Sequence, residues 1–162
     1  MEKVLVSACL IGRPVRYDGR SCPQEDQIWQ RFLRSVELVA FCPEVEGGLS
    51  VPRPAAEIVG SGGGRGVLDR IATVETADGQ DVTAAFLEGA RLCLELVRRE
   101  KIRFALLKAR SPSCGSSEIY DGSFSKTKRS GAGVTAALLR DNGVRVFDED
   151  GLEELLAVLT NS

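Results

Sequence analysis

The sequence predicts a single α/β domain: an open, mainly parallel sheet of about four strands flanked by helices, in the Rossmann-like class. Short apolar runs alternate with longer segments of helical periodicity along the whole chain. The apolar runs lack the alternation of half-exposed strands, which is typical of strands covered on both faces. The turns between segments are too short to act as linkers, so we expect residues 1–162 to form one domain.

The first half of the chain supplies two of the expected strands and one helix. Residues 4–8 form the first buried strand and residues 36–41 the second. Between them, residues 24–35 carry apolar side chains at helical spacing. A segment rich in glycine and proline follows, and its runs near 56–74 are expected to pair as a small antiparallel excursion beside the main sheet.

The second half continues the alternation of helices and strands. Thr83 is expected to N-cap a helix that ends near residue 100, with Cys93 as a small buried side chain. Residues 102–107 form the third strand and residues 144–147 the fourth. Two more helices are expected, one after Gly131-Ala132-Gly133 to about residue 141 and one at 152–159.

Composition restricts the classes of function. The hydrophobic and charged fractions, 43% and 27%, are ordinary for a globular protein, and the net charge of −2 provides no general attraction to nucleic acid or anionic membrane. The first residues contain no signal-peptide core or membrane-length apolar run, so we expect a cytoplasmic protein. The chain has no histidine, which excludes Ser-His and Cys-His nucleophiles and His-ligated zinc.

Three of the five cysteines come just after a predicted buried strand: Cys9, Cys42 and Cys114. The carboxyl ends of parallel strands meet at one edge of a sheet, so these thiols can meet in space. In a reducing compartment an odd number of cysteines does not suit a disulfide framework, which leaves packing, metal ligation or redox chemistry. Since cluster irons prefer thiolates, three cysteines would leave one iron of a [4Fe-4S] cube without a protein ligand and open to substrate.

Several motifs in fixed order give the chain its resemblance to a known family. They are Ser7-Ala8-Cys9-Leu10-Ile11-Gly12, Arg16-Tyr17-Asp18-Gly19, Cys42-Pro43-Glu44 with Gly47-Gly48-Leu49 and Pro52-Arg53, Lys108 with Ser111-Pro112-Ser113-Cys114-Gly115, and Gly133-Val134-Thr135-Ala136-Ala137-Leu138-Leu139. From near residue 3 to about residue 148, the chain resembles the thiouracil desulfidase family, formerly a bacterial family of unknown function.

The resemblance implies a [4Fe-4S]-dependent desulfidase. Such an enzyme converts a thiolated pyrimidine (2-thiouracil, 4-thiouracil or a thiouridine nucleotide) to the oxo base and sulfide without net redox change. It implies that Cys9, Cys42 and Cys114 hold a cluster with one iron free of protein ligands. The family's catalytic carboxylate and serine fall on Glu44 and Ser111. Glu44 is suited to deprotonate an attacking water, and Ser111 to relay or orient a proton.

A group of polar and basic residues suggests where the substrate or its phosphate is held. The candidates are Lys108, Ser113, Lys126, Lys128 and Arg129, together with the glycine-rich entry to the helix after residue 133. The same basic residues also fit a solvated charged loop. Arg53 and Glu57 are interpreted as a structural ion pair, and Cys22 as an incidental loop cysteine.

Two other functions also fit the three cysteines. One is an iron-sulfur or zinc-binding regulatory or sensor module, and the other is a metal-free cysteine sulfurtransferase that passes a persulfide through Cys114 or Cys9. The expected partner is a small thionucleobase or thionucleotide. Strong nucleic-acid binding is not expected, because phosphate contacts supply most non-specific affinity and this chain is slightly acidic. The sequence leaves the oligomeric state open.

Overall fold

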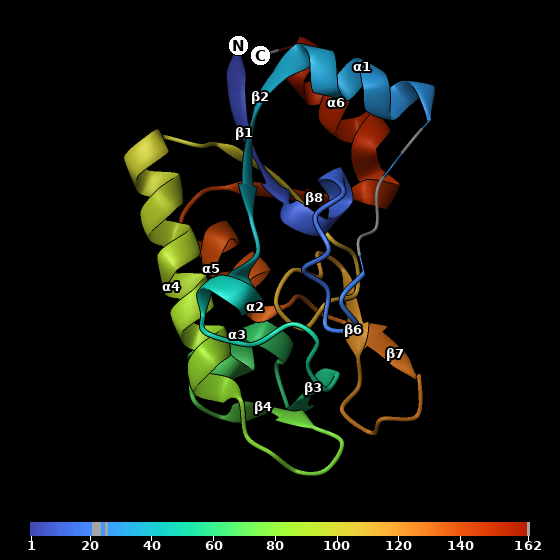
Figure 1. Cartoon of the computed structure of the whole chain (residues 1–162). Coiled ribbons are helices and arrows are strands. Elements are labelled where there is room, and N and C mark those ends of the chain that lie inside the picture. Colours follow the sequence, from blue (N-terminus) through green and yellow to red (C-terminus); the bar gives the residue numbers. More distant parts are fainter. Residues whose placement is uncertain (21–23, 25, 162) are drawn as a thin grey trace.

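A four-stranded parallel sheet forms the centre of the protein in the computed structural model, which describes residues 1–20, 24 and 26–161 (Figure 1). Its order is β2-β1-β5-β8, and every neighbouring pair is parallel. The strands are β1 (Glu2–Ser7), β2 (Val36–Phe41), β5 (Phe104–Leu107) and β8 (Arg145–Asp148). This arrangement confirms the predicted open, mainly parallel sheet with about four strands.

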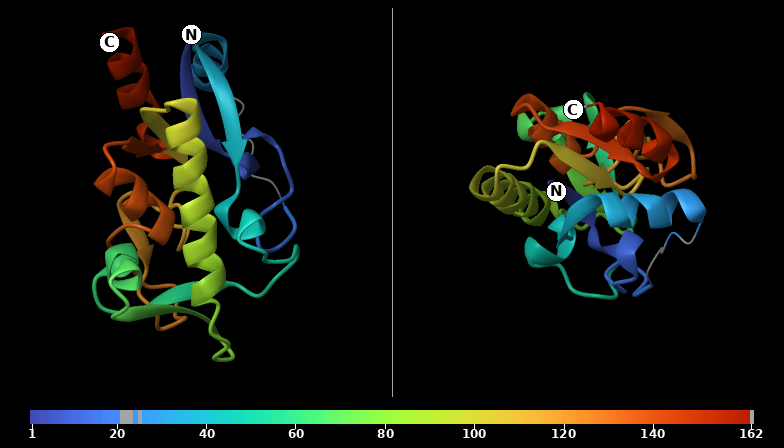
Figure 2. Two further views of the ribbon diagram at one scale, coloured as in Figure 1. Left: turned by 90° about the vertical axis from the view of Figure 1, so that its left-hand side faces the viewer. Right: turned by 90° about the horizontal axis from the view of Figure 1, so that it is seen from above.

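Helices cover both faces of the sheet, as Figure 2 shows. The helices α1 (Gln27–Ser35) and α6 (Leu152–Thr160) lie on one face, and α4 (Thr83–Glu100) and α5 (Val134–Asp141) on the other. Successive strand residues point to opposite faces, so Val4 and Val6 pack with α1 and α6 while Leu5 packs with α4 and α5. Burial on both faces explains why the strand sequences are continuously apolar.

Two antiparallel pairs lie beside the main sheet, in the lower part of Figure 1. The strands β3 (Ala56–Gly60) and β4 (Ala72–Thr76) form the predicted excursion, and α3 (Gly63–Leu68) connects them. The second pair, β6 (Glu118–Tyr120) and β7 (Lys128–Ser130), was not predicted, because both strands are only three residues long and β7 is polar. Three short helical segments complete the fold: η1 (Ala8–Ile11), α2 (Pro43–Glu46) and η2 (Glu149–Gly151).

Two helix starts differ from the prediction. Helix α1 begins at Gln27, because the carboxylate of Asp26 accepts the Trp29 backbone N–H and caps it. The expectation that Thr83 N-caps α4 is wrong. Thr83 is the first helical residue, and its hydroxyl accepts the backbone N–H of Val74 at 2.9 Å, which ties α4 to β4 instead.

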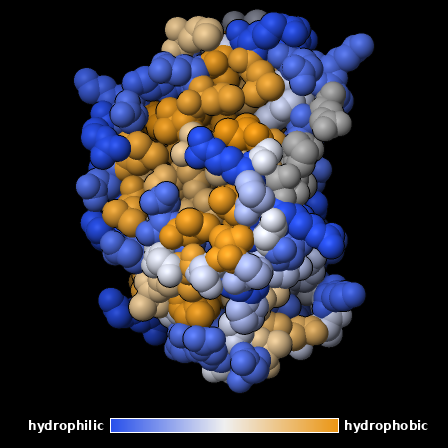
Figure 3. Space-filling model, in the orientation of Figure 1, coloured by the Kyte–Doolittle hydropathy of each residue, from blue (hydrophilic) through white to orange (hydrophobic). Residues whose placement is uncertain are grey.

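The surface around β2, an edge strand of the sheet, is largely apolar (Figure 3). After Val36 and Glu37, its remaining side chains are all half-buried. In Figure 3 apolar surface extends over this region, and hydrophilic side chains surround it. None of the helices in the described ranges has the combination of length and apolar character that crossing a membrane requires.

The short helix α2, which carries Glu44, packs very closely on α4. Two glycines permit the approach: a Cβ atom on Gly89 would lie 2.0 Å from the Pro43 carbonyl oxygen, and one on Gly47 would lie 2.1 Å from the Ala85 carbonyl oxygen. Both contacts are with backbone, which cannot move aside like a side chain. The position of α2 therefore depends on the absence of side chains at these two residues.

The variant Gly89→Ala tests this dependence. Alanine normally favours a helix over glycine by about 1 kcal/mol. Here the clash with Pro43 should outweigh that gain and lower the free energy of unfolding by about 2 kcal/mol. Urea unfolding measures the change. The control Arg99→Ala, on the exposed side of α4, should change stability by less than about 0.5 kcal/mol. A stabilised Gly89→Ala protein would contradict the packing argument.

Candidate functional site

The three strand-end cysteines line one cavity. Cys9 lies in η1 after β1, Cys42 lies between β2 and α2, and Cys114 lies in the loop after β5. The cavity has a volume of about 490 Å³, and its lining includes these three residues together with Glu44 and Ser111. Because β2, β1 and β5 are neighbours in the sheet, the loops that follow them emerge side by side.

Two of the three thiols in the cavity, Cys42 and Cys114, are held in an environment that opposes their ionisation. Burial raises the pKa of the Cys114 thiol well above its usual range, and the negative charge of Cys42, Glu44 and Cys9 nearby adds to the effect. A hydrogen bond with Ser7 opposes it. Burial also raises the pKa of Cys42. Three thiolates next to a carboxylate therefore require a positively charged group between them.

The donor set fits a cluster better than a single ion. Within the described residues, no group of three or more His, Cys, Asp or Glu side chains is arranged to hold one metal ion. In a cube each cysteine binds a different iron, so the thiols stand further apart than the ligands of one ion. Three cysteines around one roomy cavity, with no histidine in the chain, meet that requirement.

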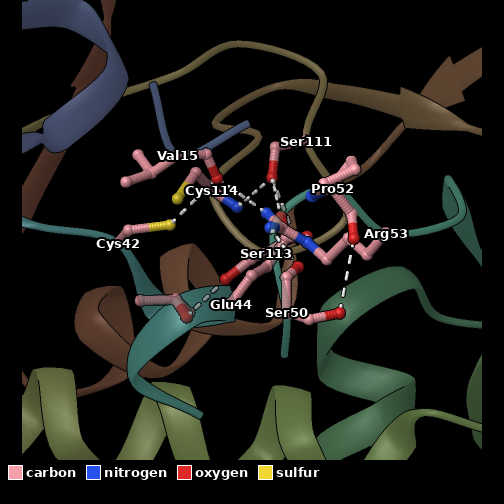
Figure 4. A network of polar contacts seen from close by, with 10 residues as sticks. Val15, Cys42, Glu44, Ser50, Pro52, Arg53, Ser111, Ser113 and Cys114 are labelled. Carbon is pink, nitrogen blue, oxygen red and sulfur yellow. Dashed lines mark hydrogen bonds and ion pairs between the residues drawn. The ribbon is translucent and has the colours of Figure 1, made fainter. Parts of the chain in front are cut away.

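Glu44 is fixed by Arg53 and Ser111, as Figure 4 shows. Its Oε1 accepts a hydrogen bond from Arg53 Nε at 3.1 Å, and its Oε2 faces Ser111 Oγ at 3.5 Å. The side chains of Arg53 and Glu44 are only 5% and 18% exposed, so the ion pair is shielded from solvent. Arg53 holds one carboxylate oxygen and leaves the other directed at Ser111.

The hydroxyl of Ser111 is oriented by the backbone of its own loop. Its Oγ accepts the N–H of Ser113 at 3.1 Å and that of Cys114 at 3.0 Å. These two bonds use the acceptor sites of the hydroxyl, so its own proton is available for Glu44. The second bond also links the hydroxyl directly to the backbone of Cys114.

Arg53 lines the cavity and has a partner that the sequence did not predict. It does not pair with Glu57, as was expected, but with Glu44. Its Nη1 and Nη2 also donate to the carbonyl oxygens of Ser50 and Val15, so one guanidinium joins three segments of the cavity wall. Val15 in turn accepts from the Cys42 thiol at 3.9 Å. The only sequence signal for this role is the position of Arg53 within the Pro52-Arg53 motif.

Of the four basic residues predicted to hold the substrate or its phosphate, only two line the cavity. Lys108 and Lys126 line the cavity, whereas Lys128 and Arg129 lie on β7 and do not. Lys108 Nζ is 2.9 Å from Glu149 Oε2, so its charge is largely paired. Lys126 is exposed and makes no ion pair with any described residue.

Ser113 and the start of α5 are used for structure. Ser113 is fully buried, and its hydroxyl is 2.8 Å from that of Thr135. The expectation of an anion site at the start of α5 is wrong, because the N–H groups of Val134 and Thr135 already donate to the carbonyls of Pro112 and Ser113. These bonds anchor the loop that carries Ser111.

The two remaining cysteines lie outside this cavity or outside the described residues. Cys93 is fully buried in the core beside α5, as expected, and burial raises its pKa to about 12. A thiol of that kind is a packing residue. Cys22 lies outside the described residues.

Comparisons with known proteins agree with one another. The family model described as 2-thiouracil desulfurase matches residues 4–151. A Bacillus subtilis (strain 168) protein named "Uncharacterized protein YbbK" is 43% identical over 153 residues, which are 94% of this chain and 99% of that protein. Among solved structures, the [4Fe-4S]-dependent thiouracil desulfidase TudS is 47% identical, with a TM-score of 0.88 and complete coverage of both chains.

Proposed function

Because the chain belongs to the 2-thiouracil desulfurase family, we propose that its cavity is an active site in which Cys9, Cys42 and Cys114 hold a [4Fe-4S] cluster. The protein is an iron-sulfur-dependent enzyme that removes sulfur from a thiolated pyrimidine. We assign these residues to the site because the three strand-end thiols, Glu44 and Ser111 line the same cavity. A reducing cytoplasm is the proposed location, since it protects the thiol ligands from oxidation.

The reaction needs no electron donor or acceptor. Water supplies the oxygen of the new carbonyl group, the sulfur leaves as sulfide, and carbon keeps its oxidation state. When bound, the cluster supplies an iron that polarises the C=S bond as a Lewis acid and accepts the sulfur. The residues of the chain have to bind the base, activate the water and move its protons.

Glu44 is the general base in this proposal. Arg53 fixes Oε1, which leaves Oε2 as the oxygen that takes the proton from the attacking water. Ser111 directs its hydroxyl proton toward the same oxygen, since its acceptor sites are filled by two backbone N–H groups. The serine thus orients the carboxylate, and Glu44 itself, once protonated by the water, is the group that can return a proton to the departing sulfide.

A thiouridine nucleotide is the finer proposal for the substrate. Two cations in the cavity lining, Arg16 and Lys126, make no ion pair with any described residue. The phosphate of a nucleotide could form charge-assisted hydrogen bonds with these two side chains. Lys108 is a weaker candidate than expected, because Glu149 already neutralises it.

Replacing each ligand cysteine tests the cluster assignment. Cys9→Ala, Cys42→Ala and Cys114→Ala proteins, reconstituted without oxygen, should lose most bound iron and all sulfide release from 2-thiouracil, since each removes one cluster ligand. Iron content and the visible spectrum measure the loss. Cys93→Ala is the control and should keep both properties. Full iron content in any of the three variants would contradict the assignment, and turnover without iron would favour the metal-free sulfurtransferase.

Replacing the proposed base separates chemistry from cluster binding. In Glu44→Gln and Ser111→Ala the three cysteines are intact, so iron content should match the wild type. The rate of sulfide release should fall about 100-fold or more for Glu44→Gln, because proton transfer by a positioned group contributes about that much. Ser111→Ala should fall less, since Glu44 remains. A wild-type rate in Glu44→Gln would exclude it as the base.

The cationic contact is tested by Lys126→Ala. The Michaelis constant for 4-thio-UMP should rise about fivefold, as expected for an exposed charge pair worth about 1 kcal/mol, while that for 4-thiouracil stays within about twofold. Lys101→Ala is a matched control, because Lys101 has a similar left-handed backbone (φ 55°, against 62° for Lys126) but lies at the end of α4. Equal changes for nucleotide and free base would refute the phosphate contact.

A further inference from the structure

The cavity has a second part, formed by the two small antiparallel sheets. Besides the strand-end loops, it is lined by Ala56 and Glu57 of β3, by Tyr120 of β6, and by Phe124 and Lys126 of the loop between β6 and β7. We define residues 121–127 as the β6–β7 loop. The cysteines, Glu44 and Ser111 come from the main sheet, so the antiparallel pairs contribute residues of another kind.

Phe124 stands apart from the other phenylalanines of the chain. Four of the six are buried core residues and a fifth, Phe41, packs against the core. Phe124 is only half-buried, belongs to none of the hydrophobic clusters of the described residues, and lines the cavity. Burial in the core therefore does not explain this aromatic side chain.

The backbone of the β6–β7 loop is held in an unfavourable conformation. Phe124 and Lys126 both have left-handed backbones, with φ angles of 57° and 62°. For residues other than glycine this conformation costs about 1–2 kcal/mol each, and it persists only where the surroundings enforce it. Two such residues in one loop, both lining the same cavity, indicate that the loop conformation has a role there.

Glu57 enforces that conformation. Its Oε1 accepts the backbone N–H groups of Gly122 at 2.9 Å and of Phe124 at 3.2 Å, so one carboxylate oxygen binds both sides of the turn. Gly122 lies so close to β3 that a Cβ atom there would be 2.6 Å from the Ile58 carbonyl oxygen. The loop is therefore fastened to β3, and the backbone of Phe124 cannot move away from the cavity without breaking these bonds.

We propose that Phe124 is a specificity-determining residue that packs against the pyrimidine ring, and that Glu57 is the positioning residue that holds it there. The inference rests on the proposed function, which supplies a planar heteroaromatic substrate. Aromatic side chains stack on nucleobases because both present extended π-faces. Because the loop that carries the ring is already ordered before the base binds, binding does not lose the conformational entropy of a flexible loop.

The test compares substrate affinity with turnover in the cluster-loaded enzyme. Phe124→Ala should raise the Michaelis constant for 2-thiouracil about tenfold, the effect of losing one stacking contact, and leave kcat within about threefold. The dissociation constant for the product uracil, measured by anaerobic calorimetry, should rise by the same factor. Phe124→Leu, which keeps an apolar contact but no ring, should lie between the wild type and Phe124→Ala in both constants.

The Glu57 variants test positioning with a matched pair. Glu57→Ala removes the acceptor for both N–H groups and should raise the Michaelis constant and the uracil dissociation constant at least about fivefold. Glu57→Gln keeps an oxygen in place and should recover most of that loss. Equal effects of the two substitutions would overturn the positioning role.

Three results would overturn the role of Phe124: unchanged constants in Phe124→Ala, a fall in kcat without a change in affinity, or a Phe124→Leu protein as impaired as Phe124→Ala. Wild-type turnover measured in the same series tests the proposed function separately. Should the wild type not release sulfide, the uracil dissociation constants would still decide whether Phe124 contacts a pyrimidine.

Discussion

The site depends on the adjacency of three parallel strands. Neighbouring strands lie about 4.8 Å apart, so the loops that follow β2, β1 and β5 start close together at one edge of the sheet. That adjacency brings Cys9, Cys42 and Cys114 to one cavity although they are distant in sequence. The rest of the fold supports it: four helices cover the sheet, and the glycine contacts between α2 and α4 fix the residues that follow Cys42.

The negative charges of the cavity need positive partners, which explains the position of Arg53 beside Glu44. Burial opposes ionisation of Cys114 and Cys42, and the carboxylate of Glu44 next to them makes further negative charge more costly. Arg53 compensates Glu44 with a shielded ion pair, while the thiols are left to be compensated by a bound cationic group. Arg53 and a cluster bound as proposed would therefore compensate different parts of the negative charge in the cavity.

Much of this organisation could be predicted from the sequence, because it follows from patterns that local physics controls. Continuous apolar runs predicted the parallel sheet, and residues placed just after those runs predicted which thiols meet. Contacts set by three-dimensional neighbours were not predictable. Arg53 and Glu57 lie close in sequence, yet each binds another partner, Arg53 the carboxylate of Glu44 and Glu57 the backbone of the β6–β7 loop. Ser113 lies beside Cys114 but packs on α5.

The β6–β7 pair was the least predictable part of the fold. Its two strands have three residues each, which is too few for periodicity to give a signal. Lys126 and Lys128 illustrate the consequence: they are two residues apart, but only the first lines the cavity. Where the loop turns, and hence which of its side chains line the cavity, depends on Glu57 and on the close approach of Gly122 to β3.

We propose that the strand-end cysteines hold a cluster with one iron open to substrate beside Glu44 and Ser111. An anaerobic crystal structure of the reconstituted enzyme, with iron located by anomalous scattering, tests it most directly. We expect four irons in the cavity, three of them bonded to Cys9, Cys42 and Cys114, and a fourth without a protein ligand. Iron bound elsewhere, or a fourth protein ligand that closes the cluster, would contradict it.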